Sequence, residues 1–119
     1  MRSRYAAFAL REVDYLWRTL DETHEDRALP RERVLAALRS AASTNRYMGL
    51  RILDAAGPDG GGITRVLFYA RVFERGKNKS FVEASRFTRD GAAFRYLDGQ
   101  ARAASGDEDV TLHLTLRDF

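Results

Sequence analysis

The chemistry in this sequence gathers around one carboxylate between two phenylalanines, in the stretch FVEASRF. In a β-strand alternate side chains face the same way, so Phe81, Glu83, Ser85 and Phe87 share one face. A carboxylate buried without a partner is costly, so Glu83 needs a group to pair with. The pattern predicts either an internal ion pair or a polar spot in a pocket.

Three interpretations of this carboxylate follow from the residues that could reach it. In the first, Arg4 pairs with Glu83 and docks the amino-terminal helix on the sheet, which fixes register more than it adds stability. In the second, both side chains line a ligand pocket. In the third, Glu83 is a general acid or base, but the sequence supplies no second group with a defined role.

The predicted pocket lies between the sheet and the first helix, with apolar walls and a few convergent polar groups. Its candidate binding residues are Arg4, Tyr5, Phe68, Glu83, Ser85, Phe87, Phe94 and Tyr96. No catalytic residue, metal ligand or cofactor is predicted.

Helices must position one wall of this pocket. Apolar residues recur at three- and four-residue steps over the first twenty residues, but Glu12 would interrupt the stripe. A break near residues 10–12 removes the problem and predicts two helices, or one that is kinked. The polar run 21–30 is a predicted loop, from which Pro30 opens a further helix that fades around residues 43–45.

Strands must position the opposite wall, because the apolar period changes to two after the helices. The predicted strands are 47–55, 63–74, 80–89, 93–99 and 109–117. GPDGGG, RGKNK and the Asp-Gly of RDGA are predicted turns, Asp98–Gly99 ends the fourth strand, and QARAASGDED is a loop. The last strand alternates Val110, Leu112, Leu114 and Leu116 with polar residues, as a half-buried strand does.

Helices followed by hairpin-connected strands are typical of an α+β fold with an antiparallel sheet covered by helices on one side. A twisted sheet of four to five strands wrapped around the helices forms a cone with an open mouth, which commonly carries a pocket. The length of 119 residues predicts a single domain, residues 1–119.

Composition limits the function classes. The chain has no cysteine, which excludes disulfides and thiolate metal sites, and no apolar run reaches the length of a membrane span. We expect mature sequence without a signal peptide and a cytoplasmic location. Eighteen of the twenty basic residues are arginine, as in GC-rich bacterial genomes, and they scatter along the sequence, so nucleic-acid binding is not expected.

Several stretches resemble the YchJ-like proteins in order and rough spacing. They are MRSRYAAF at 1–8, DYLWRT at 14–19, GLRIL at 49–53, VLFYARV at 66–72, FVEASRF at 81–87 and FRYLDG at 94–99. The resemblance implies an NTF2-like (cystatin-like) cone for the central domain.

The chain departs from the family at its cysteine-rich, zinc-binding SEC-C motifs, which usually precede MRSRY and often recur at the carboxyl end. Without cysteine the zinc role cannot be carried over. Either the gene has lost the motif or the sequence begins inside a longer one.

Three function classes remain at this point. The favoured one is a noncatalytic module that binds a small ligand or a protein. The second is a small enzyme of the dehydratase or isomerase kind, which would need a His–Asp or Tyr–Asp dyad inside. The third is a nucleic-acid or ribosome-associated accessory protein. The outer sheet face, with Leu67, Tyr69 and Phe73, is apolar enough to predict a homodimer.

Overall fold

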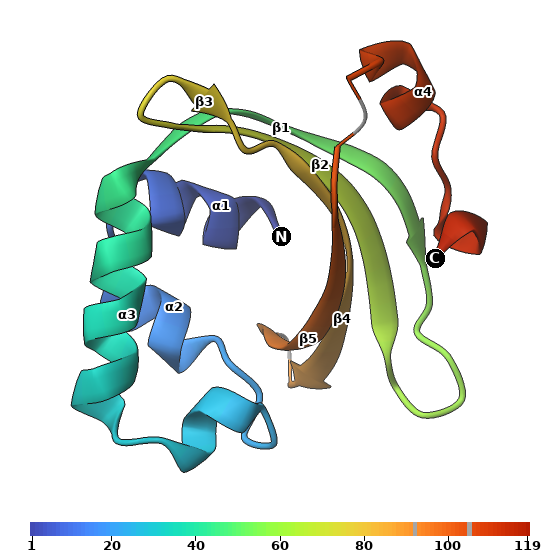
Figure 1. The fold of residues 1–119 in the computed structure, drawn as a ribbon. Helices are drawn as coiled ribbons and strands as arrows, with labels where there is room; N and C mark the ends of the chain where they lie inside the picture. Colours follow the sequence, from blue (N-terminus) through green and yellow to red (C-terminus); the bar gives the residue numbers. More distant parts are fainter. Residues whose placement is uncertain (92, 105) are drawn as a thin grey trace.

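The computed structural model describes residues 1–91, 93–104 and 106–119. Ala92 of the predicted RDGA hairpin and Ser105 of the predicted loop lie outside the described residues. The helices precede a curved antiparallel sheet and lie on its concave side, so the α+β class and the cone are as predicted (Figure 1).

The amino-terminal part is helical, with the predicted break in place. The helices are α1 (Arg2–Ala9), α2 (Val13–Arg18), the 3₁₀ helix η1 (Glu25–Ala28) and α3 (Arg31–Thr44). Between α1 and α2, Arg11 has φ 60°, a left-handed conformation that no α-helix contains. The exposed Glu12 thereby stays outside the buried stripe. Among the described helices none is long and apolar enough to cross a membrane.

The sheet follows the first four predicted strands closely, with one extension and with a short strand, Lys77–Asn78, inside the predicted turn RGKNK. Its strands are β1 (Asn45–Ala56), β2 (Thr64–Glu74), β3 (Lys77–Asn78), β4 (Phe81–Asp90) and β5 (Ala93–Ala103). They pair in the order β1-β2-β4-β5, and the short β3 pairs with β2. The predicted end of the fourth strand at Asp98–Gly99 is wrong, because β5 continues to Ala103.

The concave face carries the Glu83 carboxylate. In the register between β2 and β4, Phe68 pairs with Glu83 and Ala70 pairs with Phe81. Phe68 and Ala70 form a buried cluster against which Tyr5 of α1 packs. Glu83 therefore faces the helices, as the strand alternation predicted.

The carboxyl-terminal strand predicted over 109–117 is wrong. The segment forms a short helix α4 (Glu108–Leu112) and a 3₁₀ turn η2 (Leu116–Asp118). Val110, expected to be buried, is 54% exposed, whereas Thr111, expected on the wet face, is fully buried.

A helix start hidden in the preceding acidic run explains this error. The Asp107 side chain accepts hydrogen bonds from the backbone N–H groups of Asp109 and Val110, as an N-cap residue does. Glu108 and Asp109 add negative charge to the first turn, where the helix dipole favours it. Local capping here outweighs the alternating pattern.

The carboxyl-terminal segment covers part of the outer sheet face. Leu116 packs on Leu67 and Ala84, and its backbone N–H donates to Asp54 Oδ2 at 2.9 Å. Figure 1 shows this segment on the convex side, opposite α1 and α2. Leu67, predicted as part of an exposed outer face, is therefore fully buried by the chain itself.

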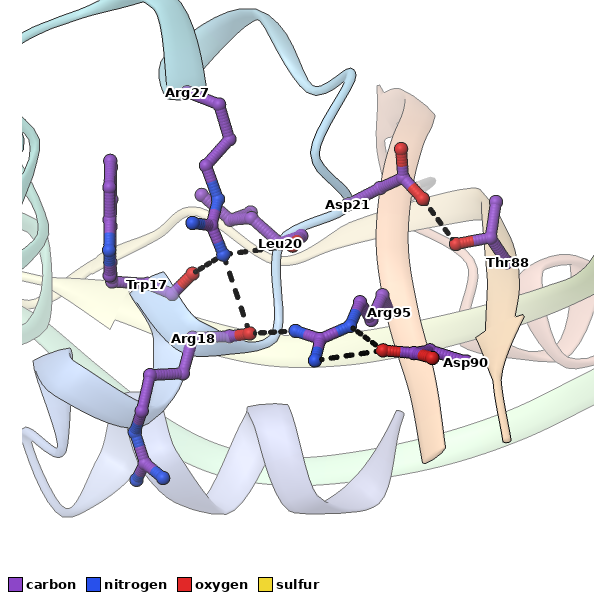
Figure 2. Close-up of polar contacts among 8 residues, drawn as sticks. All are labelled: Trp17, Arg18, Leu20, Asp21, Arg27, Thr88, Asp90 and Arg95. Atoms are coloured by element: carbon purple, nitrogen blue, oxygen red, sulfur yellow. Dashed lines mark hydrogen bonds and ion pairs between the residues drawn. The ribbon is translucent and has the colours of Figure 1, made fainter. Parts of the chain in front are cut away.

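Two arginines from distant elements cap the carbonyl end of α2 (Figure 2). Arg27 donates to the carbonyls of Trp17 at 2.9 Å and Leu20 at 3.1 Å, and its guanidinium lies 4.6 Å from the Trp17 ring centroid. Arg95 of β5 donates to the carbonyl of Arg18. Carbonyls at a helix end have no partner within the helix, so these donors satisfy them.

The chain after α2 is also bonded to the edge of the sheet. Tyr96 N donates to the Thr19 carbonyl at 2.6 Å, and Asp21 N donates to the Tyr96 carbonyl at 2.7 Å. The Asp21 side chain accepts from Thr88 of β4 and from Thr23 Oγ1, the latter at 2.6 Å. These contacts fix the segment that follows α2 to the edge of the sheet formed by β5 and β4.

Replacing Leu116 by Ala tests the packing of the carboxyl-terminal segment. The substitution leaves a cavity over Leu67 and Ala84, so the free energy of unfolding should fall by about 2–5 kcal/mol in urea titrations. The control is Val110→Ala, at an exposed position of the same segment. Equal small effects of both variants would contradict the packing described.

The bonds to Asp21 predict a pH dependence. The hydrogen bond from Thr23, and next that from Thr88, lowers the pKa of Asp21. An aspartate in the unfolded chain has a pKa of about 3.9. Because the pKa of Asp21 is lower in the folded state, its ionised carboxylate stabilises the fold at pH above about 3.9, and this stabilisation is lost as the pH falls through the folded-state pKa. Asp21→Asn should therefore lower the melting temperature at neutral pH, with the difference shrinking as the pH falls below about 3.9. Glu22→Gln, which removes the same charge from an exposed neighbour, should show no such trend in circular-dichroism melts.

Candidate functional site

A cavity of about 170 Å³ lies between α1 and the concave face of the sheet. The sheet contributes Phe68, Glu83 and Tyr96, and α1 contributes Arg4 and Tyr5. Five of the eight predicted site residues therefore line one cavity. Its walls are mostly aromatic, with polar groups at a few points.

The Glu83 carboxylate is held by two hydroxyl groups from the sheet itself. Its Oε2 accepts from Ser85 Oγ at 2.5 Å and from Tyr96 Oη at 3.0 Å. No hydrogen bond from the described residues reaches Oε1. The described residues thus engage one oxygen of this carboxylate, and Glu83 lines the cavity.

The predicted ion pair between Arg4 and Glu83 is wrong. The buried Arg4 instead donates to the Leu16 carbonyl at 3.0 Å and to Thr19 Oγ1, at the carbonyl end of α2. Its guanidinium lies 4.7 Å from the centroid of the Tyr96 ring. Tyr96 therefore stands between the two charged groups, with its ring on Arg4 and its hydroxyl on Glu83.

The environment keeps Tyr96 protonated. Burial, followed by the negative charge of Glu83 and the hydrogen bond to it, raises the pKa of Tyr96 well above the ordinary value. Burial likewise lowers the pKa of Arg4, which Tyr96 and Glu83 oppose. At neutral pH the Tyr96 hydroxyl can donate a hydrogen bond but cannot serve as a base.

The three remaining predicted residues support or lie beside the cavity. Ser85 is fully buried, and its hydroxyl donates a hydrogen bond to Glu83 Oε2. Phe87 is buried, with its ring centroid 5.7 Å from that of Tyr96. Phe94 is 47% exposed and lies in a separate cleft beside Trp17, with Arg89 over its ring.

Several lining residues were missing from the predicted set. They are Met1, Phe8, Tyr47, Ala70 and Phe81. Strand alternation places Ala70 and Phe81 on the concave face, and Phe8 follows Tyr5 by three residues on α1, so the sequence carried a signal for these. Within the described part of the chain, no group of three or more His, Asp or Glu residues is placed to hold a metal ion.

His24 and Asp98 both lie outside the lining of the cavity. His24 is half-buried, and its Nδ1 accepts from Asp26 N at 3.0 Å and caps η1. Its ring lies 5.7 Å from that of Tyr96. Asp98 does not face the cavity, because it pairs with Arg86 through contacts of 2.7 and 2.5 Å.

Gly99 provides the space in which the Glu83 carboxylate sits. It pairs with Ser85 across the sheet and so belongs to the concave face. A Cβ at this position would overlap Glu83 Oε2 and lie 2.5 Å from Tyr96 Oη. The Asp-Gly pair predicted to be a turn is therefore part of a strand, and its glycine makes room for the site.

Gly99→Ala should therefore displace Glu83 and Tyr96 and destabilise the fold by about 1–3 kcal/mol, as overpacking does. In a Glu83→Ala background, which removes the obstructing carboxylate, the same substitution should have a smaller effect in chemical denaturation. Gln100→Ala, at the exposed neighbouring position, is the control. Additive effects of Gly99→Ala and Glu83→Ala would contradict this view of the glycine.

The fold and site can now be compared with known proteins. A solution structure of a SEC-C motif containing protein from Rhodopseudomonas palustris is 30% identical to this chain and superposes with a TM-score of 0.71. The match covers 88% of this chain and 76% of that one. A family model for the middle, NTF2-like domain of YchJ matches residues 1–99, which contain every residue of the cavity. The chain therefore belongs to the YchJ family, and residues 1–99 form its middle NTF2-like domain.

Proposed function

We propose that the concave cavity binds a small, mostly apolar molecule with a hydrogen-bonding group, and that the chain is a noncatalytic binding module. The observation that carries this proposal is the Tyr5 hydroxyl, which is buried without a hydrogen-bond partner among the described residues. A buried unsatisfied polar group costs about 1–3 kcal/mol. A ligand that accepts a hydrogen bond from Tyr5 would remove this cost.

The size and polarity of the cavity define the ligand class. A volume of about 170 Å³ suits one aromatic ring, since an apolar cavity of about 150 Å³ can hold benzene. Tyr5 supplies a donor and Glu83 Oε1 supplies an acceptor, so a phenol-like hydroxyl could use both. Phe68 and Phe81 supply apolar contacts for the ring.

Catalysis is supported less well by this arrangement. Of the titratable groups at the cavity, Tyr96 is held as a donor by its raised pKa, and Glu83 already accepts from two hydroxyls. Neither histidine lines the cavity, so no His–Asp dyad stands among the described residues of its lining. Recognition by hydrogen bonds explains these groups without a chemical step.

The homodimer and the cytoplasmic location expected from the sequence stay part of this proposal. Less of the outer face can form a dimer contact than the sequence predicted, because Leu67 and Ala84 lie under Leu116 of the same chain. The part of the outer face near Arg71 and Phe73 is left for such a contact.

A matched pair of probes tests the ligand class. p-Cresol and toluene have similar shape, and only the first carries a hydroxyl. We expect the wild-type chain to bind p-cresol more tightly, and Tyr5→Phe to reduce this preference about fivefold, the equivalent of one hydrogen bond of about 1 kcal/mol. Amide chemical shifts of β2, β4 and β5 would report the binding.

Tyr15→Phe is the control, because the Tyr15 hydroxyl donates to Ser3 outside the cavity. It should leave the preference unchanged. Glu83→Gln should weaken p-cresol binding and spare toluene. Absence of shift changes at millimolar concentrations of both probes, or changes confined to residues outside the cavity, would refute the proposal.

A further inference from the structure

A second cleft, of about 540 Å³, lies at the far end of the sheet and has a different chemical character. The α1–α2 turn contributes Arg11, the start of β1 contributes Arg46, and the β2–β3 turn contributes Arg75. Met48, 54% exposed, and Phe73 form its apolar part. Three cationic side chains thus converge on a partly apolar cleft.

These three guanidinium groups have no protein partner. Over residues 1–91, 93–104 and 106–119, no ion pair or side-chain hydrogen bond involves any of them. Some arginines elsewhere in the fold are engaged: Arg4 and Arg27 bind carbonyls, and Arg86 binds Asp98. Other arginines, such as Arg33 and Arg39 of α3, are exposed, but they do not line this cleft. The convergence of three guanidinium groups on one cleft therefore distinguishes this end of the molecule.

Two of the three occupy backbone positions that disfavour arginine. Arg11 has φ 60° and Arg75 has φ 50°, both in the left-handed region where Gly, Asn or Asp is preferred. Arg75 and Gly76 form the two-residue turn between β2 and β3, for which Asn-Gly is the favoured pair. Strained backbone at a binding surface is a recognised sign of function.

The cationic groups continue from the cleft over the outer face of the sheet. Strand pairing opposes Arg46 to Phe73, Gly49 to Arg71 and Arg51 to Tyr69. Arg46, Arg71 and Arg51 therefore follow one another diagonally on this face, about 7–8 Å apart at each step. All three are exposed, and the carboxyl-terminal segment covers the outer face further along the sheet, at Leu67 and Ala84.

We call this set the arginine strip: Arg11, Arg46, Arg51, Arg71 and Arg75. The closest carboxylates in sequence, Glu12 and Glu74, form no ion pair with it in the described chain. A row of unpaired cations that crosses two strands is too long to be covered by one phosphate group, so it matches a ligand with several phosphates. The apolar side chains beside the cations, the exposed Met48 and the half-buried Phe73, suit unstacked bases, which single strands offer and duplexes do not.

We propose that the arginine strip binds the backbone of a single-stranded nucleic acid, with bases resting on Met48 and Phe73. The strip uses the sheet face opposite the concave cavity, so this binding is independent of the ligand proposed for that cavity. It uses the same Arg71 and Phe73 as the homodimer contact, so the strip binds nucleic acid in the monomer and excludes that dimer. Five phosphate contacts on a single strand predict a salt slope near about −3.5, or roughly 100-fold weaker binding from 50 to 200 mM salt.

Fluorescence anisotropy tests the proposal with a labelled 20-nucleotide RNA of mixed sequence and its DNA counterpart. The double variant Arg46→Glu/Arg71→Glu should weaken binding at least tenfold. The control variant Arg33→Glu/Arg39→Glu makes the same change in net charge at exposed positions of α3. Its affinity for the oligonucleotides should stay within about twofold of wild type at a salt concentration that screens long-range electrostatic effects. If the reversal variant melts early, Arg46→Gln/Arg71→Gln provides a milder test.

The proposal is supported if the wild type binds the RNA, the DNA or both, and if this binding is lost in the strip variant and kept in the control. Equal weakening in both variants would overturn it, since net charge alone would then explain binding. Competition by inorganic phosphate at low millimolar concentration would indicate a small-anion site instead. Binding to phosphatidylserine vesicles without binding to either oligonucleotide, or a dimer that covers the strip in sedimentation, would also overturn it.

Discussion

The carbonyl end of α2 is the point on which the rest of the structure depends. A six-residue helix is too short to be stable alone in water. Arg4 from α1, Arg27 from η1 and Arg95 from β5 all donate to its last carbonyls. These cationic donors join three distant segments at one helix end and hold the helical layer over the sheet, with a cavity left between them.

Much of the fold was predictable because local patterns and the final packing agree. Alternation in β2 and β4 sorted Phe68 and Glu83 onto the concave face, and the misfit of Glu12 located the break between α1 and α2. The carboxyl-terminal segment was mispredicted because its alternating apolar residues compete with a capped helix start. Asp107 and the two acidic residues after it were the overlooked signal.

Most residues that line the cavity were predictable, whereas their hydrogen-bond partners were not. Strand parity alone brings Glu83, Ser85 and Phe68 to one face, but it cannot say which cation reaches the carboxylate. The sequence made Arg4 a plausible partner for Glu83, but the Arg4 guanidinium instead donates to the Leu16 carbonyl at the end of α2. The role of Gly99 depends on contact across two strands, and the arginine strip likewise appears only when pairing places Arg46, Arg51 and Arg71 on one face. Scatter along a sequence therefore says little about scatter on a surface.

The positions of the two chain ends have a practical consequence for anyone handling this domain. Met1 lines the concave cavity, while Phe119 packs on the outer side of the sheet (Figure 1). A peptide joined ahead of Met1 begins at the cavity wall, where it can fill the cavity. Affinity handles and reporter fluorophores fused to the carboxyl end avoid that obstruction.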